Sequence, residues 1–438
     1  MRVVVVGGGF AGMASAARLA KLGHAVTLLE AASTLGGALG STTVDDFTFD
    51  TGPSTTLLPA VTRDLFRKSG RPIERELDLV PVEVIRTHRF ADGATLALPG
   101  GSRAAQKRAF DALHPGSGAA WVGYVDSWAE PWERLRKDYL ERPWDPDLAH
   151  PDAAALLRSR TTLHQAVTRH LDDPRARAVA THSFVADGHD PRRVPAWLGT
   201  ISYVEQKFGA WTVDGGLSLL GEALARRLTT RKVEIHTATP VTDVLVRSAR
   251  VRGVRTDAGE LEADVVVCAV DPRQFPALRP WIRGTRPVAL PRITHLGISG
   301  ALPPWVADSG EVVLHGGRGE STLVLRHGGT APVDHAVLTV QHRGDARTDL
   351  VAELAARGVD LRDRVVTRVE RSPADLTALW GGSPLGVQWR GRSTLRRRWG
   401  PTTPVAGLYA AGAHATPGSG LPFTGLSGAL VAQSVGPA

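Results

Sequence analysis

Cysteine and long apolar runs are what this sequence has least of. Its 438 residues include one cysteine, Cys268, which excludes an intrachain disulfide framework and any cysteine-rich zinc or iron–sulfur site. No uninterrupted apolar run approaches the roughly 20 residues that span a bilayer. The 47 Gly and 29 Pro follow no period, which excludes a collagen-like chain. With 42% hydrophobic and 22% charged residues, the chain has the composition of an ordinary globular protein.

Acidic residues and lysine are also scarce. Lys and Arg together number 52 against 44 Asp and Glu, a net charge of +8, and only six of the basic residues are Lys. Because the basic residues are spread out and carry no nucleic-acid-binding motif, we expect no nucleic-acid partner. The 15 His form no H-E-x-x-H motif, and C-x-x-C is absent, so we expect no metal. For His182 and His189 we expect surface positions or satisfied polar roles.

The first 30 residues have the order strand, glycine turn, helix, strand, acid. Arg2 to Val6 is typical of a buried parallel strand, and Met13 to Leu22 is rich in the helix formers Ala and Leu. A second strand, Ala25 to Leu29, ends at Glu30. The intervening spacing G-x-G-x-x-G favours a dinucleotide-binding unit over the signal peptide that an apolar N-terminus could also indicate.

Each part of this unit has a physical role. Gly7 permits the tight turn, Gly9 lets a pyrophosphate approach the backbone, and Gly12 lets the helix pack closely on the strand. The start of the helix offers free N–H groups to the phosphates. Glu30 is placed to accept hydrogen bonds from ribose hydroxyls, and its charge would repel the extra phosphate of NADP. This unit alone does not distinguish FAD from NAD.

Two adjacent glycines, Gly36 and Gly37, and the segment Phe49 to Ser54 follow soon after. On composition alone they would fit an ordinary loop and hairpin. Their sequences, however, resemble the phytoene desaturase family of FAD-dependent oxidoreductases, a branch of the amine-oxidase-like flavoproteins. The segments that carry this resemblance, in the family's order, are Val3 to Glu30 with Gly36-Gly37, Phe49 to Ser54, Val204 to Trp211 with Gly215-Gly216-Leu217, Ala263 to Val267, Gly407 to Ala413 and Pro417 to Leu421-Pro422.

The resemblance implies FAD as the cofactor. Gly407 to Ala411 is typical of a strand and Ser427 to Gln433 of a short helix, and the glycines at 412, 418, 420 and 425 would let the backbone approach a ligand. In the family this strand, glycine turn and helix lie along the flavin ring. Two positions depart from related flavoproteins: Ala38 replaces a common Arg, and Ala413-His414 replace the acid of amine oxidases, which favours the desaturase branch. His414 is the one weak candidate for a part in the chemistry. The residues expected to contact FAD are Gly7, Gly9, Phe10, Ala11, Gly12, Glu30, Ala31, Gly36, Gly37, Ala38, Pro53, Ser54, Val241, Gly412, Ala413, Leu421 and Pro422.

The resemblance also predicts the domain organisation. The fold class is α/β, with a discontinuous Rossmann-like FAD-binding domain formed by residues 1–80, 205–270 and 401–438. Residues 81–204 and 271–400 are expected to form an α+β substrate-binding domain.

Aromatic residues recur at helical spacing within this second domain, from Trp121 to Tyr139. They indicate either a packed helix stripe or a lid or membrane-contacting face, with Pro131 starting a new segment or bending the helix. Arg390-Gly391-Arg392 and Arg396 to Trp399 resemble a basic surface patch.

The function that the resemblance implies is removal of hydride from a hydrophobic, isoprenoid-like substrate, with electrons passed to an external acceptor. The alternatives are a tailoring oxidase or amine-oxidase-like enzyme, and a flavin-dependent polyene isomerase. No second dinucleotide motif occurs, so we expect no NAD(P)H domain. We expect a cytoplasmic protein, with peripheral association at a membrane left open because the chain is basic. The oligomeric state is left open as well.

Overall fold

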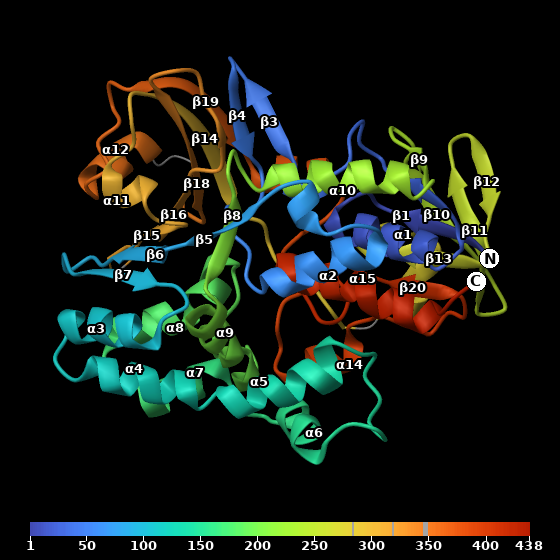
Figure 1. Cartoon of the computed structure of the whole chain (residues 1–438), viewed down its shortest axis with the longest axis horizontal. Helices are drawn as coiled ribbons and strands as arrows, with labels where there is room; N and C mark the ends of the chain where they lie inside the picture. The colour runs from blue at the N-terminus through green and yellow to red at the C-terminus, as the bar shows by residue number, and fades with distance from the viewer. Residues whose placement is uncertain (283, 318, 345–348) are drawn as a thin grey trace.

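A parallel sheet brings together distant parts of the chain. The computed structural model describes residues 1–282, 284–317, 319–344 and 349–438. Within these residues, five parallel strands lie in the order β20-β13-β1-β2-β9. The sheet lies near both chain termini, on the right of Figure 1. Its strands are β1 (Arg2–Val6), β2 (Ala25–Leu29), β9 (Glu234–His236), β13 (Val265–Cys268) and β20 (Leu408–Ala410).

Helices cover one face of this sheet and a second, antiparallel sheet covers the other. Val5 of β1 packs into a core with Val431 of α15, and Val4 packs on the opposite side with Val254 of β11. Because both faces are covered, β1 is apolar and buried from Val3 to Val6. The covering elements are α1 (Phe10–Lys21), α2 (Pro59–Ser69), α10 (Ser218–Thr230), α15 (Leu421–Val435), β10 (Val241–Arg247), β11 (Arg250–Thr256) and β12 (Gly259–Glu262).

The last helix, α15, begins at Leu421, earlier than the sequence-based expectation of Ser427. Pro422 fits its first turn because no intrahelical N–H bond is needed there. Gly425 consequently lies inside the helix, and a Cβ added to it would stand 3.1 Å from the ring of Phe10. This glycine therefore lets α15 pack closely on α1, and the expectation that it approaches a ligand is wrong.

A third sheet, of seven strands, lies at the upper left of Figure 1, in the order β19-β14-β18-β16-β15-β6-β7. Its neighbouring strands are antiparallel except β15 and β6, which are parallel. Leu354 of α12 packs on its core. The elements of this region are β6 (Val84–Arg89), β7 (Thr95–Pro99), β14 (Arg292–Ser299), α11 (Pro304–Ala307), β15 (Val312–Leu314), β16 (Leu323–Arg326), β18 (His335–His342), α12 (Leu350–Ala356) and β19 (Val365–Arg371).

A layer of helices lies below these sheets in Figure 1. The aromatic stripe forms its core: Trp121 and Tyr124 are fully buried, and Trp121 stacks on Phe110 with ring centroids 4.1 Å apart. The stripe is thus a packed helix face, and the alternative of a lid or membrane-contacting face is wrong for these side chains. Pro131 lies in the first turn of a new helix, as expected. The helices are α3 (Arg103–Leu113), α4 (Ser117–Asp126), α5 (Ala129–Leu135), α6 (Pro151–Arg158), α7 (Leu163–His170), α8 (Pro174–Ala186) and α9 (Thr200–Phe208).

Short strands form two further small sheets. In one, β3 and β4 pair as a hairpin and β17 pairs with β4; in the other, β5 pairs with β8. The predicted α/β class, with a parallel sheet and further mixed sheets, is confirmed. Across the described ranges, no helix combines the length and apolarity that crossing a membrane requires. The remaining elements are β3 (Ser41–Val44), β4 (Phe47–Asp50), β17 (Gly329–Thr330), β5 (Leu79–Val82), β8 (Ala210–Val213), α13 (Pro373–Trp380) and α14 (Arg392–Arg397).

Candidate functional site

The carboxyl ends of the parallel strands open into a cavity of about 1090 Å³. Gly7 follows β1, Glu30 follows β2, Ala269 follows β13 and Gly412 follows β20, and all four residues line this cavity. Ligands of open parallel sheets bind at this edge. A pocket for one small molecule has roughly 300–1,000 Å³, so this cavity lies just above the upper end of that range.

Of the residues expected to contact a cofactor, all except Gly12 and Ser54 line this cavity. Gly12 lies behind the wall, where an added Cβ would collide with the carbonyl oxygen of Gly7. It therefore has the helix-packing role that the glycine spacing predicts. Ser54 is buried and its hydroxyl donates to the carbonyl of Gly310 at 2.7 Å. The structure thus gives these two residues supporting positions.

The glycine turn forms an open cradle at the start of α1. Gly9 is extended, with φ −70° and ψ 176°, and α1 begins directly after it at Phe10, three residues earlier than the expected Met13. Among the residues that the structure describes, no side chain caps the first turn of α1, so its N–H groups are available to a ligand. A Cβ added to Gly9 meets no atom within 4 Å, and it would extend into the open space of the cradle. This geometry suits a pyrophosphate.

Glu30 fixes the shape of this cradle. One of its carboxylate oxygens accepts the N–H of Gly8 at 2.5 Å, and the other accepts the N–H of Ala32 at 2.7 Å. A carboxylate offers about four lone-pair positions. Glu30, which lines the cavity, therefore retains acceptor capacity for ribose hydroxyls while it holds both backbone turns.

Asp50 connects the Phe49 to Ser54 segment with the segment that contains the paired glycines Gly215 and Gly216. It ends β4, and its carboxylate accepts the N–H groups of Leu217 at 2.7 Å and Ser218 at 3.3 Å. A Cβ added to Gly216 would stand 2.8 Å from this carboxylate, so the paired glycines make room for it. Burial raises the pKa of Asp50. The interaction fixes the start of α10, where Ser218 lines the cavity.

The C-terminal glycine turn closes the cavity on the β20 side. Gly418 and Gly420 line it, and the N–H of Gly412 donates to Ser427 Oγ at 2.8 Å. Behind the turn, Arg398 donates to the carbonyl of Pro417 at 2.8 Å. Arg398 is buried and stacks over Trp389 at 4.3 Å. The expectation that it belongs to a basic surface patch is therefore wrong, whereas the neighbouring Arg390, Arg396 and Arg397 are exposed.

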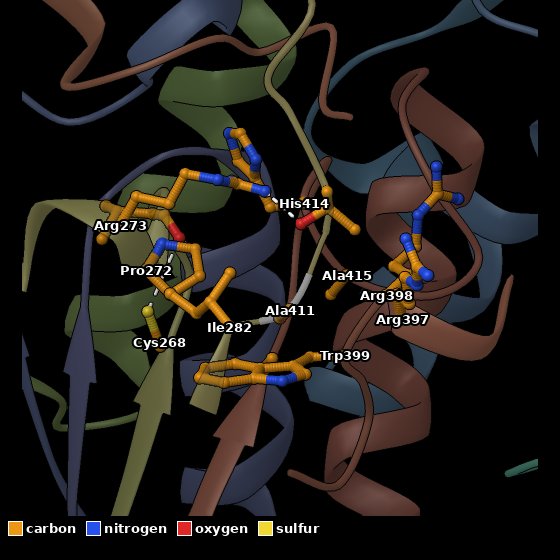
Figure 2. Close-up of a pocket in the computed structure, with 13 residues that line it drawn as sticks. Cys268, Pro272, Arg273, Ile282, Arg397, Arg398, Trp399, Ala411, His414 and Ala415 are labelled. Atoms are coloured by element: carbon orange, nitrogen blue, oxygen red, sulfur yellow. Dashed lines mark hydrogen bonds between the residues drawn. The ribbon is translucent and has the colours of Figure 1, made fainter. Parts of the chain in front are cut away.

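His414 lies in the wall between two cavities. It lines the large cavity and also a small one of about 20 Å³ beside Trp399, which Figure 2 shows together with Cys268, Arg273 and Ala411. The small cavity has room for about one water molecule. His414 Nε2 lies 3.8 Å from Asp271, and burial lowers the pKa of His414 to about 4. The imidazole is thus neutral at physiological pH.

The large cavity extends from the parallel sheet into a chamber that is lined by the seven-stranded sheet and the helical layer. Part of the chamber wall is apolar and aromatic. It comes from the segment before α2, from β6, from the helical layer, from β14 and the loop before it, and from the C-terminal region. These apolar wall residues are Leu57, Ile85, Leu140, Phe184, Trp197, Leu198, Ile201, Leu290, Ile293, Trp389 and Phe423.

The chamber also contains buried histidines and charged groups. His182 and His189 are 4% and 7% exposed and line the cavity, so surface positions are wrong for both. His182 Nε2 lies 3.0 Å from Glu311 Oε1, the satisfied polar role that was the other expectation. Burial is the main cause that lowers the pKa of His182, and it lowers the pKa of His189 to about 4.

Sequence reasoning missed most of this chamber. Its charged residues Arg86, Glu205, Glu311 and Arg326 stand on four separate segments and form no local motif. The residues after β13, Val270 and Asp271, were also missed as wall residues. They could have been found from the rule that parallel strands end at a common ligand-binding edge.

The sheet, the glycine cradle and the acid after β2 define a dinucleotide-binding site of the flavoprotein kind. The family model described as flavin containing amine oxidoreductase matches residues 10–300. The chain belongs to this family.

Two similar proteins match different shares of this chain. The first is a zeta-carotene-forming phytoene desaturase from Myxococcus xanthus, to which the chain is 32% identical over 276 residues. The matched part is 62% of this chain and 53% of that protein. The second is a 4,4'-diapolycopene oxygenase from a Methylomonas species, to which the chain is 25% identical over an alignment of 488 residues. This alignment covers 99% of this chain and 98% of that protein. The chain thus spans about half the length of the first relative.

The fold has solved counterparts. A cyclohexylamine oxidase from Brevibacterium oxydans superposes with a TM-score of 0.65 at 18% identity, over 99% of each chain. The family confirms the predicted flavin. Since the βαβ unit and Glu30 suit an adenosine half, the cofactor is FAD. The open cradle at Gly9 and the uncapped start of α1 fit its pyrophosphate.

Proposed function

We propose that the protein is an FAD-dependent desaturase or dehydrogenase that removes hydride from a hydrophobic, isoprenoid-like substrate and passes the electrons to an external acceptor. The observation that carries this proposal is the continuity of the glycine cradle with a chamber that has an extended apolar wall. The names of the phytoene desaturase and diapolycopene oxygenase relatives support it. Because the cavity is large and part of its wall is apolar, a long apolar substrate suits it better than a small polar one.

We propose the following roles within this function. Bound FAD supplies the hydride acceptor. The wall residues Gly7, Gly9 and Glu30 would hold its adenosine half, and the turn around Gly412 would face its ring. The apolar wall orients the substrate and excludes water. His414, buried and neutral, is a candidate to interact with the flavin edge through Nδ1, which has no hydrogen-bond partner among the described residues.

We also propose the domain organisation expected from the sequence. Residues 1–80, 205–270 and 401–438 carry the cofactor, and residues 81–204 and 271–400 carry the substrate. The five strands of the parallel sheet come from the first set, which supports this division.

The decisive experiment compares substrates under anaerobic conditions. Phytoene in liposomes should bleach the flavin absorption of the holoenzyme and yield a product with a longer conjugated chromophore. Bleaching by soluble amines, with none by polyenes, would replace the proposal by an amine-oxidase-like activity, the activity that the name of the cyclohexylamine oxidase states for that protein. Isomerised polyene without bleaching would indicate a flavin-dependent isomerase.

A peripheral membrane location is proposed because an apolar substrate resides in bilayers. Leu148 lies in the segment before α6 and is 69% exposed. The exposed Arg158 ends α6, Arg390 precedes α14 and Arg396 lies in α14, and the two helices are in contact. Exposed basic residues favour an anionic lipid surface. The protein should co-sediment with anionic vesicles and less with neutral ones, and equal recovery with both would contradict the proposal.

A further inference from the structure

One wall of the substrate chamber is built from charged side chains, although the proposed substrate is apolar. Arg86, Glu205, Glu311 and Arg326 all line the cavity, together with Asp187 at the end of α8. They come from β6, α9, the segment before β15, β16 and the end of α8, so the fold gathers them from five places. A chamber for a pure hydrocarbon needs no such wall, because each buried charge costs free energy unless it is paired.

Four of these groups pair with one another. Arg86 donates to Glu205 at 2.8 Å and to Glu311 at 3.1 Å, and Arg326 donates to the other oxygen of Glu311 at 2.8 Å. Burial opposes ionisation of Glu311, but Arg326, His182 and Arg86 hold the pKa of Glu311 well below its ordinary value. Two positive and two negative charges therefore balance, and this part of the wall is satisfied.

Asp187 is not part of these ion pairs. The carbonyl of the preceding Ala186 accepts from Gln341 at 2.9 Å and from Arg343 at 3.1 Å, which fixes Asp187 beside the paired charges. Among the residues that the structure describes, none donates a hydrogen bond to the Asp187 carboxyl. Burial raises its pKa to about 6, against the opposing effect of Arg326 and Arg343. A hydrocarbon that filled the chamber would strip water from this carboxyl without replacing its hydrogen bonds.

We propose that the substrate carries a hydroxyl group on its apolar chain and that Asp187 accepts a hydrogen bond from this hydroxyl. The inference rests on the proposed function and narrows its substrate class. An acceptor selects a donor, which favours a hydroxyl over an ether or a carbonyl. A substrate ammonium is disfavoured because Arg326 and Arg343 act on the same position with positive charge. The apolar wall holds the rest of the chain by excluding water.

The test compares two substrates that differ in one hydroxyl. Phytoene, and phytoene hydrated at one terminal double bond, are titrated in the same liposomes into the holoenzyme, and Kd is read from the perturbation of the flavin spectrum. The wild-type protein should bind the alcohol at least tenfold more tightly, the expected gain from a hydrogen bond to a charged acceptor. Asp187→Leu should lower this preference to below threefold.

The matched control is Asp190→Leu. Asp190 is an exposed carboxylate three residues further on, lies outside the cavity wall and accepts the N–H of Arg192 at 2.9 Å. This variant should keep the preference for the alcohol. Equal Kd values for the two substrates in the wild type, or an undiminished preference in Asp187→Leu, would overturn the inference while the proposed function stands. If neither substrate binds or reduces the flavin, both fail.

Discussion

Replacement of Glu30 tests how much of FAD binding depends on a single carboxylate. In Glu30→Gln the charge is lost, but the amide oxygen can still accept one of the two N–H groups, of Gly8 or Ala32, that the carboxylate accepts. One charge-assisted hydrogen bond contributes about 1.5–3 kcal/mol. Loss of one bond to ribose should therefore raise the Kd for FAD by roughly 10- to 150-fold. In Glu30→Ala both backbone N–H groups also lose their partner, so the apoprotein should be destabilised as well.

The assay is calorimetric titration of apoprotein with FAD, with urea unfolding of the apoprotein measured in parallel. Glu234→Gln is the matched control, since Glu234 is an exposed carboxylate on the neighbouring strand β9 and lies outside the cavity wall. It should leave the Kd unchanged. If Glu30→Gln also leaves the Kd unchanged while its apoprotein remains folded, the carboxylate serves only the backbone turns and the ribose role is refuted.

Three further results are expected. Gly9→Val should abolish FAD binding with little change in apoprotein stability, because the new side chain enters the open cradle; retained yellow colour after purification would contradict this. Trp121→Ala should lower the free energy of unfolding by about 3–5 kcal/mol in urea titrations, because this side chain is fully buried against Phe110. Asp187→Asn should remove a pH dependence of stability. Since the pKa of Asp187 in the folded protein is raised to about 6, the folded state holds a proton that the unfolded state releases near pH 4. Wild-type stability should thus fall, relative to the variant, by up to about 3 kcal/mol as the pH rises from 4 to 6, and parallel curves would show the carboxyl to be solvated. The charged groups that act on its carboxyl are Arg326, Arg343 and Glu311.

The cofactor half of the site was predictable because its signals are local. A β-branched run, three spaced glycines and an acid after the second strand occur within 30 residues, and each has a fixed place in a βαβ unit. The bounds of β1 and β2 agree with the sequence-based expectation. The start of α15 was placed too late because Gly425 was interpreted as a residue that faces a ligand, whereas it faces Phe10 of α1.

The aromatic stripe shows the limit of periodicity. The spacing from Trp121 to Tyr139 defines a helix face, but a face that packs on protein and one that contacts a lipid surface have the same pattern. Only the position of Phe110 and the other helices decides that these side chains are buried. Likewise, Arg398 belongs to a run of arginines, and only its stacking on Trp389 shows that it is internal.

The sequence by itself determined the class of protein and its cofactor cradle, since turn geometry, helix start and strand end are set by residues adjacent in the chain. The tertiary structure decided the substrate chamber. Arg86, Asp187, Glu205, Glu311 and Arg326 lie on segments far apart in sequence. They meet because β6 joins the seven-stranded sheet beside β15, because Glu205 of α9 pairs with Arg86 of β6, and because His182 of α8 interacts with Glu311 before β15. A buried charge is tolerated only where partners come within hydrogen-bond distance, and that distance is a property of the fold.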